Sequence, residues 1–232
     1  MFSLSAVTVT LALLGATVSN ASPAKRFGCP KYEVITARGT TLAQGDTSGY
    51  TDMLNKILAA VPGGSHYDVN YPASIDFYNS LNAGVNDLTV HINNGITFCP
   101  NQVYALLGLS QGAQVIDNYL QKVNTTSNVN IYNHIKAIVL LGDPSHMPNN
   151  PSNIDEFGGT STNPYIGGGI GGFRSPPLPT WYSNGRLLDI CHNQDIICAV
   201  NQTGANLDNH LQYNGSSVVQ NLGANFVVPK LS

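Results

Sequence analysis

Apolar and polar residues along the chain alternate between short apolar runs and segments with a helical period. The pattern predicts five strands, over residues 32–37, 67–71, 103–107, 135–141 and 186–190. It predicts four main helices, over residues 49–60, 82–92, 113–123 and 217–228. Strands separated by helices are typical of a parallel sheet with right-handed crossovers, in which helices cover both faces. We therefore expect an α/β fold.

Residues 144–183 interrupt this alternation. They are rich in Pro, Gly, Asn and Ser and show no clear period, which is typical of a functional or mobile segment. The segment contains the glycine-rich run 167–172, for which a phosphate cradle is the alternative interpretation. That run lacks the G-x-x-x-x-G-K-[ST] pattern and no predicted strand leads into it. One domain over residues 27–232 accounts for the rest of the chain.

The first residues are predicted to be a targeting segment rather than part of the fold. An apolar or small run over 8–16 is followed by Ser19 and Ala21, which predicts a signal peptide over 1–21. The run is too short to span a bilayer, so we expect a secreted, extracellular protein without a membrane anchor. Lys25-Arg26 suggests a propeptide over 22–26, although two ordinary charges near a flexible terminus explain the pair equally well.

Charge excludes one class of partner. Only 10% of the residues are charged, and the formal net charge is −3. Lys25 and Arg26 are two of the ten basic residues, so residues 27–232 keep eight basic and 13 acidic residues, a charge of −5. No basic patch suggests binding to nucleic acid. A surface with few charges fits a secreted monomer acting on neutral polymers. Three glycosylation sequons fit secretion as weak signals, at Asn124, Asn201 and Asn214.

The four cysteines indicate two disulfides, because an even number in an exported chain favours paired thiols. Spacing alone allows three ways to pair Cys29, Cys99, Cys191 and Cys198. The last two are close enough to close a local loop. A zinc site is not supported, since the chain has neither a C-x-x-C pair nor an H-x-x-x-H spacing.

Ser110 is the leading candidate catalytic residue. It lies in Gly108-Leu109-Ser110-Gln111-Gly112, directly after the apolar run 103–107, which is the layout of a nucleophile elbow. Glycine two positions either side removes Cβ atoms that would collide in such a sharp turn. The backbone N–H after the serine would then face a developing oxyanion. The alternative is a buried turn between a strand and a helix whose serine has no role.

A serine nucleophile needs a histidine to accept its proton and a carboxylate to orient that histidine. In this fold the chain order is nucleophile, acid, histidine. His210 is favoured over His134, His146 and His192 because it lies immediately before the last predicted helix. Asp195 is the favoured acid, since it follows a strand end and lies between Cys191 and Cys198. Asp143 and Asp189 remain the alternative acids.

Taken together, these motifs resemble the cutinase and acetylxylan esterase family of secreted fungal serine esterases. The resemblance rests on the elbow at 108–112, on Asp195 between two cysteines, on His210-Leu211 and on Ala37-Arg38-Gly39-Thr40, and it runs from about Cys29 to the C-terminus. It implies a cutinase-like α/β-hydrolase fold, with a central parallel sheet flanked by helices and no lid domain.

The resemblance also implies roles for individual residues. Ser110 would be the nucleophile, Asp195 the orienting acid and His210 the general base. The backbone N–H groups of Thr40 and Gln111 would form the oxyanion hole, with help from the Thr40 hydroxyl. The disulfides would pair Cys29 with Cys99 and Cys191 with Cys198. No metal or cofactor is implied.

The substrate signals conflict within this family. The elbow usually carries an aromatic residue where this chain has Leu109, a change we expect to be tolerated because that side chain faces into the sheet. Thr40 is closer to acetylxylan esterases, whereas four cysteines are closer to cutinases. We favour hydrolysis of cutin-like polyesters or short- to medium-chain esters. The alternatives are an acetylxylan esterase and, from another class, a secreted binding protein on a decayed hydrolase scaffold.

Overall fold

A computed structural model describes residues 28–171 and 174–232 of the chain. The predicted signal peptide over 1–21 and propeptide over 22–26 lie outside the described residues. The described strands are β1 (Tyr32–Ala37), β2 (Gly64–Asp68), β3 (Val103–Leu109), β4 (Ile135–Leu141), β5 (Asn153–Ile154) and β6 (Leu187–Ile190). They form one six-stranded sheet in the order β2-β1-β3-β4-β6-β5, and every pairing is parallel. The predicted parallel α/β sheet is confirmed.

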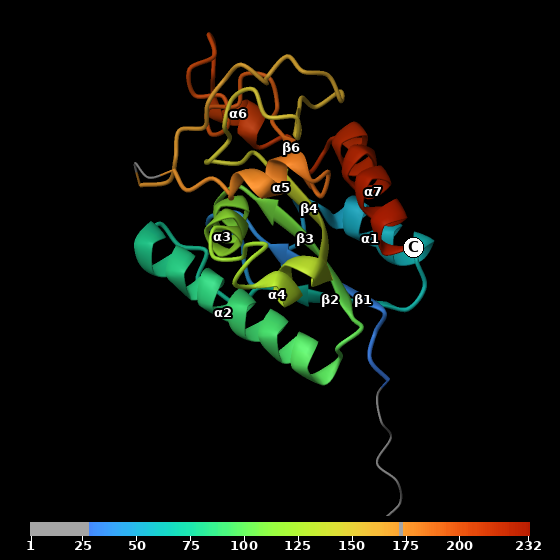
Figure 1. The fold of residues 1–232 in the computed structure, drawn as a ribbon. Helices are drawn as coiled ribbons and strands as arrows, with labels where there is room; N and C mark the ends of the chain where they lie inside the picture. Colours follow the sequence, from blue (N-terminus) through green and yellow to red (C-terminus); the bar gives the residue numbers. More distant parts are fainter. Residues whose placement is uncertain (1–27, 172–173) are drawn as a thin grey trace, which may run out of the picture.

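The described helices are α1 (Thr51–Ala60), α2 (Phe77–Phe98), α3 (Gln111–Leu120), α4 (Val129–His134), α5 (Pro179–Ser183), α6 (Leu207–His210) and α7 (Ser217–Leu231). Figure 1 shows α2, α3 and α4 on one face of the sheet and α1 and α7 on the other. This arrangement places helices on both faces, as the alternating pattern of the sequence predicts.

The two faces explain the apolar pattern of the strands. Val34 and Ile35 are neighbours in β1, yet they pack into different clusters of buried residues. Ile35 packs with residues of α2 and α3, and Val34 packs with residues of α1 and α7. Successive side chains of a strand point to opposite faces, so a strand buried on both sides must be apolar at consecutive positions.

Two elements differ from the sequence prediction at their ends. The pattern predicts the second strand over residues 67–71, but β2 spans Gly64–Asp68, because Gly64 pairs with Tyr32 at the start of β1. A Cβ atom at Gly64 would lie 2.1 Å from Cζ of the Tyr32 ring, so the aromatic ring occupies the space that glycine leaves free. The second helix is predicted over 82–92 but runs from Phe77 to Phe98, well beyond its clear apolar period.

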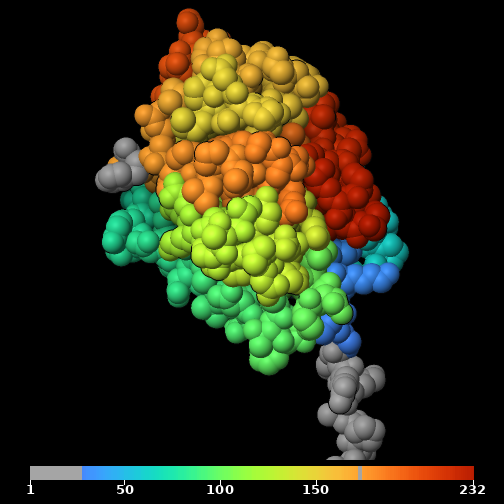
Figure 2. Space-filling model, viewed as in Figure 1, coloured from blue at the N-terminus to red at the C-terminus, as the bar shows by residue number. Residues whose placement is uncertain are grey.

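Residues 144–183 contain β5 and α5, two short elements that the sequence pattern did not reveal. Within the glycine-rich run, Gly167 N donates a hydrogen bond to His146 O at 2.9 Å and Gly169 N donates one to Pro144 O at 2.8 Å. Gly168 N also donates to Ile197 O at 2.8 Å. In Figure 2 the gold-coloured part of the segment covers the upper end of the molecule.

Both implied disulfides are present. Cys29 is joined to Cys99, which ties the residues before β1 to the end of α2. Cys191 is joined to Cys198, which closes the loop that follows β6. None of the helices described is long and apolar enough to cross a membrane.

Candidate active site

Ser110 lies on a sharp turn between β3 and α3. Its backbone has a φ of 54° and a ψ of −117°, a conformation that is unusual for a residue other than glycine. A Cβ atom at Gly108 would lie 2.7 Å from the Ala113 Cα, and one at Gly112 would lie 1.9 Å from the Ala37 carbonyl oxygen. The backbone approaches both glycines of the motif so closely that a side chain would not fit at either position. The sharp turn leaves the serine side chain accessible at the end of the strand.

Asp195 and His210 form a buried pair. The Nδ1 atom of His210 lies 2.9 Å from Oδ2 and 3.0 Å from Oδ1 of Asp195. The carboxylate also accepts a hydrogen bond from the backbone N–H of Ile197 at 2.7 Å, within the loop closed by the second disulfide. Because Nδ1 faces a carboxylate, it carries the proton, and Nε2 is left as the atom able to accept one.

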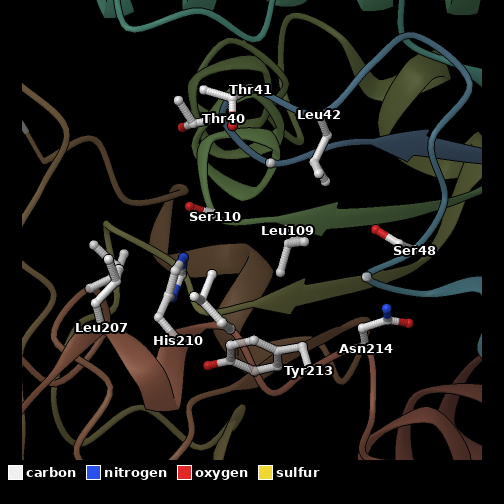
Figure 3. A pocket seen from close by; sticks show the side chains of 14 residues that line it. Thr40, Thr41, Leu42, Ser48, Leu109, Ser110, Leu207, His210, Tyr213 and Asn214 are labelled. Atoms are coloured by element: carbon white, nitrogen blue, oxygen red, sulfur yellow. The ribbon is translucent and has the colours of Figure 1, made fainter.

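Ser110 and His210 line the same cavity, which has a volume of about 400 Å³. Figure 3 shows both side chains facing this cavity, with Thr40 and Thr41 on one side and Leu207 on another. No direct hydrogen bond joins the Ser110 hydroxyl to His210 within the described residues. Such contacts are often long in a free enzyme and shorten when substrate binds. The structure thus brings all three residues of the predicted triad to one site.

The Gln111 side chain holds the loop that carries Thr40. It is fully buried, and its Nε2 donates to the Ser74 carbonyl oxygen at 2.8 Å and to the Thr40 hydroxyl at 3.3 Å. Its Oε1 accepts a hydrogen bond from the Ser80 hydroxyl at 2.8 Å. The sequence motif assigns a role only to the backbone N–H of Gln111. Its side chain also links the elbow to the Thr40 loop by hydrogen bonds, a role that the motif alone did not reveal.

The other candidate acids and histidines are engaged elsewhere. Asp189 contacts His146, whose Nδ1 lies 2.7 Å from its Oδ2, and both side chains are fully buried. Asp143 accepts a hydrogen bond from the backbone of Ser145. Burial lowers the pKa of His192, and its backbone N–H donates to the Tyr213 hydroxyl at 3.0 Å. Only Asp195 contacts His210 among these acids, as far as the described residues extend.

Asp117 and Asp143 form a second buried group of carboxyls. Both side chains are fully buried and in mutual contact. Within the described part of the chain, neither oxygen of Asp117 receives a hydrogen bond from another donor. Two neighbouring buried carboxylates repel each other, which favours the protonated form. Burial, reinforced by the charge of Asp189, raises the pKa of Asp143 to about 7, and burial also raises the pKa of Asp117.

Two residues that touch the imidazole were not predicted from the sequence. The Tyr213 hydroxyl donates a hydrogen bond to Oδ2 of Asp195 at 2.7 Å. The Tyr213 ring packs edge-on against the His210 ring, with the two ring centroids 5.9 Å apart. Gly142, at the end of β4, has a φ of 56°. A Cβ atom there would lie 2.7 Å from Cε1 of His210. The position of Gly142 directly after a buried strand was the signal available in the sequence.

Leu109 corrects an expectation. Its side chain is expected from the sequence to face into the sheet; it packs against the buried core, but it also lines the cavity beside Ser110 (Figure 3). The reason is its place at the last position of β3, where the backbone of Gly49, and not a side chain, lies against it. An exchange at this position therefore changes the cavity, and it is not a neutral difference in packing.

The comparisons with known proteins define the class of this protein. The sequence model of the Cutinase family matches residues 28–231. Cutinase 11 of Verticillium dahliae is 30% identical over 86% of this chain and 69% of its own length. Acetylxylan esterase of Hypocrea jecorina is 29% identical over 82% of this chain and 67% of its own length.

A solved structure agrees with these relatives. A cutinase-like protein from Cryptococcus sp. superposes with a TM-score of 0.79 and 33% sequence identity, and the match covers 88% of this chain and 97% of that one. The fold and the site define a carboxylic ester hydrolase of the α/β-hydrolase class. The chain belongs to the Cutinase family.

No group of three or more His, Cys, Asp or Glu side chains is arranged to hold a metal ion in the part of the chain that the structure describes.

Proposed function

We propose that this protein is a secreted serine esterase that hydrolyses cutin-like polyesters or short- to medium-chain acyl esters through an acyl-enzyme. The proposal rests on one observation above the others. A serine on a nucleophile elbow faces a cavity that also contains a histidine bonded to a buried aspartate. Ester hydrolysis itself follows from the family, so the proposal concerns the residues, the substrate and the place of action.

The reaction would proceed in two acyl-transfer steps. His210 Nε2 takes the proton of the Ser110 hydroxyl while Oγ attacks the ester carbonyl carbon. The tetrahedral intermediate collapses when the bond to the alcohol oxygen breaks, and the alcohol leaves with the proton from His210. Water then attacks the acyl-enzyme, again losing a proton to His210. The acid is released as Ser110 recovers its proton. Asp195 orients the imidazole and stabilises its charged form.

The backbone N–H groups of Thr40 and Gln111 would bind the oxyanion. Gln111 is the first residue of α3, where backbone N–H groups lack partners within the helix. The hydrogen bond from the Gln111 side chain to the Thr40 hydroxyl supports this role, because it keeps the two loops together. Each donor of this kind contributes about 2.7–4 kcal/mol in the transition state.

The lining of the cavity favours substrates whose acyl chain is longer than acetyl. Leu42, Leu109 and Tyr213 give its walls an apolar surface beyond the serine. Leu207 and Leu211 are exposed apolar side chains at its edge, which favours a water-insoluble polyester over a hydrated polysaccharide. The acetylxylan esterase relative keeps deacetylation of xylan as the second candidate. Rates on cutin-like polyester, p-nitrophenyl esters and acetylated xylan, measured side by side, separate the two.

A fluorophosphonate probe tests the enzyme against a binding protein on a decayed scaffold. We expect labelling that maps to Ser110 and disappears in Ser110→Ala. His210→Ala should lower ester hydrolysis by several orders of magnitude. The matched control is His192→Ala, because His192 is also buried and also packs against Tyr213. Folded protein that is not labelled contradicts the serine mechanism, and a larger loss in His192→Ala contradicts the assignment of the base.

Secretion belongs to the same proposal. Two disulfides fit an oxidising compartment. Expression of the full chain in a secreting host should deliver protein to the medium, with an N-terminus at residue 22 or 27 by mass spectrometry. Retention of the whole chain, with Met1 intact, contradicts it.

A further inference from the structure

We propose that Leu109 sets the length of the acyl chain that the enzyme accepts, as the adjustable floor of an acyl-binding part of the cavity. The inference rests on the proposed function, since it presumes that Ser110 is acylated. It starts from the geometry of the tetrahedral intermediate, whose central carbon carries three groups besides the Ser110 oxygen. These groups are the oxyanion, the alcohol oxygen and the acyl chain.

Two of these three directions are already assigned. The oxyanion must point toward the backbone of Thr40 and Gln111, and the alcohol oxygen must point toward His210, which protonates it. Leu207, an exposed residue of α6, lies on the His210 side (Figure 3). The acyl chain therefore takes the remaining direction. In Figure 3 that direction passes Leu109 toward Ser48 and Asn214.

Leu109 occupies the centre of this path because Gly49 makes room for it. A Cβ atom at Gly49 would lie 2.4 Å from Cδ2 of Leu109, closer than side chains can approach, whereas one at Gly39 would lie at an ordinary contact distance of 3.4 Å from the same atom. The side chain thus packs directly against the Gly49 backbone, next to the nucleophile. A larger side chain at 109 does not fit against that backbone, so it must extend into the path of the acyl chain.

The first test changes the floor itself. The measured quantity is the ratio of kcat/KM for p-nitrophenyl octanoate to kcat/KM for p-nitrophenyl acetate. Leu109→Phe should lower this ratio about tenfold or more, because hydrophobic pockets discriminate by roughly 10- to 200-fold per methylene at most. Leu109→Ala should raise the ratio. Val129→Phe, at an exposed position on α4 outside the cavity, serves as the matched control and should leave the ratio unchanged.

The second test moves Leu109 without replacing it. Gly49→Ala places a methyl group 2.4 Å from Cδ2 of Leu109, and because the side chain also packs against the buried core, we expect it to shift toward the cavity. We expect the octanoate ratio to fall in Gly49→Ala and to be restored in the double variant Gly49→Ala/Leu109→Ala. This pair of variants keeps the inference testable if Leu109→Phe does not fold.

The outcomes separate this inference from the proposed function. An unchanged ratio in both Leu109→Phe and Gly49→Ala overturns the role of Leu109, even if every ester is still hydrolysed. A uniform loss on all chain lengths also overturns it, since a floor residue must discriminate between substrates. Unaltered protein that hydrolyses none of the esters, with Ser110 unlabelled, contradicts the serine mechanism instead.

Discussion

The Tyr213 hydroxyl and the imidazole of His210 bind the same oxygen of Asp195, Oδ2, at 2.7 and 2.9 Å. Tyr213 therefore holds the Asp195 carboxylate in the orientation in which it binds the His210 imidazole. Tyr213 is fully buried, and its hydroxyl accepts a hydrogen bond from the backbone N–H of His192, so Asp195 is linked to the residues that follow β6.

We expect Tyr213→Phe to lower kcat about tenfold with little change in KM. A hydrogen bond to a charged group contributes about 1.5–3 kcal/mol, and its loss leaves the carboxylate less well positioned. Steady-state kinetics on p-nitrophenyl butyrate measure this effect. Tyr104→Phe is the matched control, because it also removes a buried tyrosine hydroxyl, one with no hydrogen-bond partner in the described residues. Equal losses in the two variants would show a general effect of packing.

Gly142→Ala should reduce kcat by about a hundredfold or more. The new methyl group would lie 2.7 Å from Cε1 and 2.9 Å from Nδ1 of His210, so the ring must move, and small displacements of a catalytic group cost that much. Gly142 also has a positive φ, a conformation that costs alanine roughly 1–2 kcal/mol, so the variant should be less stable as well.

Gly185→Ala separates these two effects. Gly185 has a φ of 71°, and a Cβ atom there would meet no other atom within 4 Å, so alanine brings the backbone cost without a collision. Thermal unfolding should show destabilisation in both variants, larger in Gly142→Ala because of the added collision, whereas only Gly142→Ala should lose activity. A fully active Gly142→Ala protein would mean that the imidazole tolerates displacement.

Most of the fold could be predicted from the sequence because the central strands are buried on both faces and therefore stand out as apolar runs between helical segments. Ser110 and Asp195 are candidates because they follow strand ends, and His210 is a candidate because it lies immediately before the last helix. Tyr213 and Gly142 could not be predicted, since their contacts depend on how the loop after β4 meets the loop before α7. The prediction for Leu109 is incomplete for a related reason: the last side chain of a strand also borders loops, and the sequence of a loop has no period that shows what it covers.

The two disulfides should differ in what their removal does. The Cys29–Cys99 bond links residues 70 apart in the sequence, and the loop-entropy estimate for such a span is about 4 kcal/mol. Replacing both cysteines by serine should lower the unfolding temperature strongly and leave kcat unchanged, because the bond lies away from the cavity residues.

Replacing Cys191 and Cys198 by serine should instead lower kcat. That bond joins residues only seven positions apart, so its loop-entropy contribution to stability is smaller, but the loop that it closes contains Asp195. Paired measurements of unfolding temperature and kcat on both double variants check this contrast. If the Cys191/Cys198 variant is fully active, the loop holds Asp195 without its disulfide.

The buried carboxyls of Asp117 and Asp143 predict how stability depends on pH. The pKa of Asp143 is raised from 3.8 to about 7 by burial and by the charge of Asp189, and the pKa of Asp117 is raised in the same direction. A carboxyl whose pKa is higher in the folded state binds its proton more tightly there. Its contribution to stability is therefore complete below about pH 4 and is lost as the pH rises through about 7.

Asp117→Asn should weaken this dependence. The amide has nearly the shape of the protonated carboxyl and carries no charge at any pH, so one of the two groups no longer titrates. We expect the fall in unfolding temperature between pH 5 and pH 8 to be smaller in Asp117→Asn than in the unaltered protein. Asp52→Asn, at an exposed position on α1, is the control and should leave the fall unchanged. An equally steep fall in Asp117→Asn would place the titrating groups elsewhere, because the titration of Asp117 then contributes nothing measurable to stability.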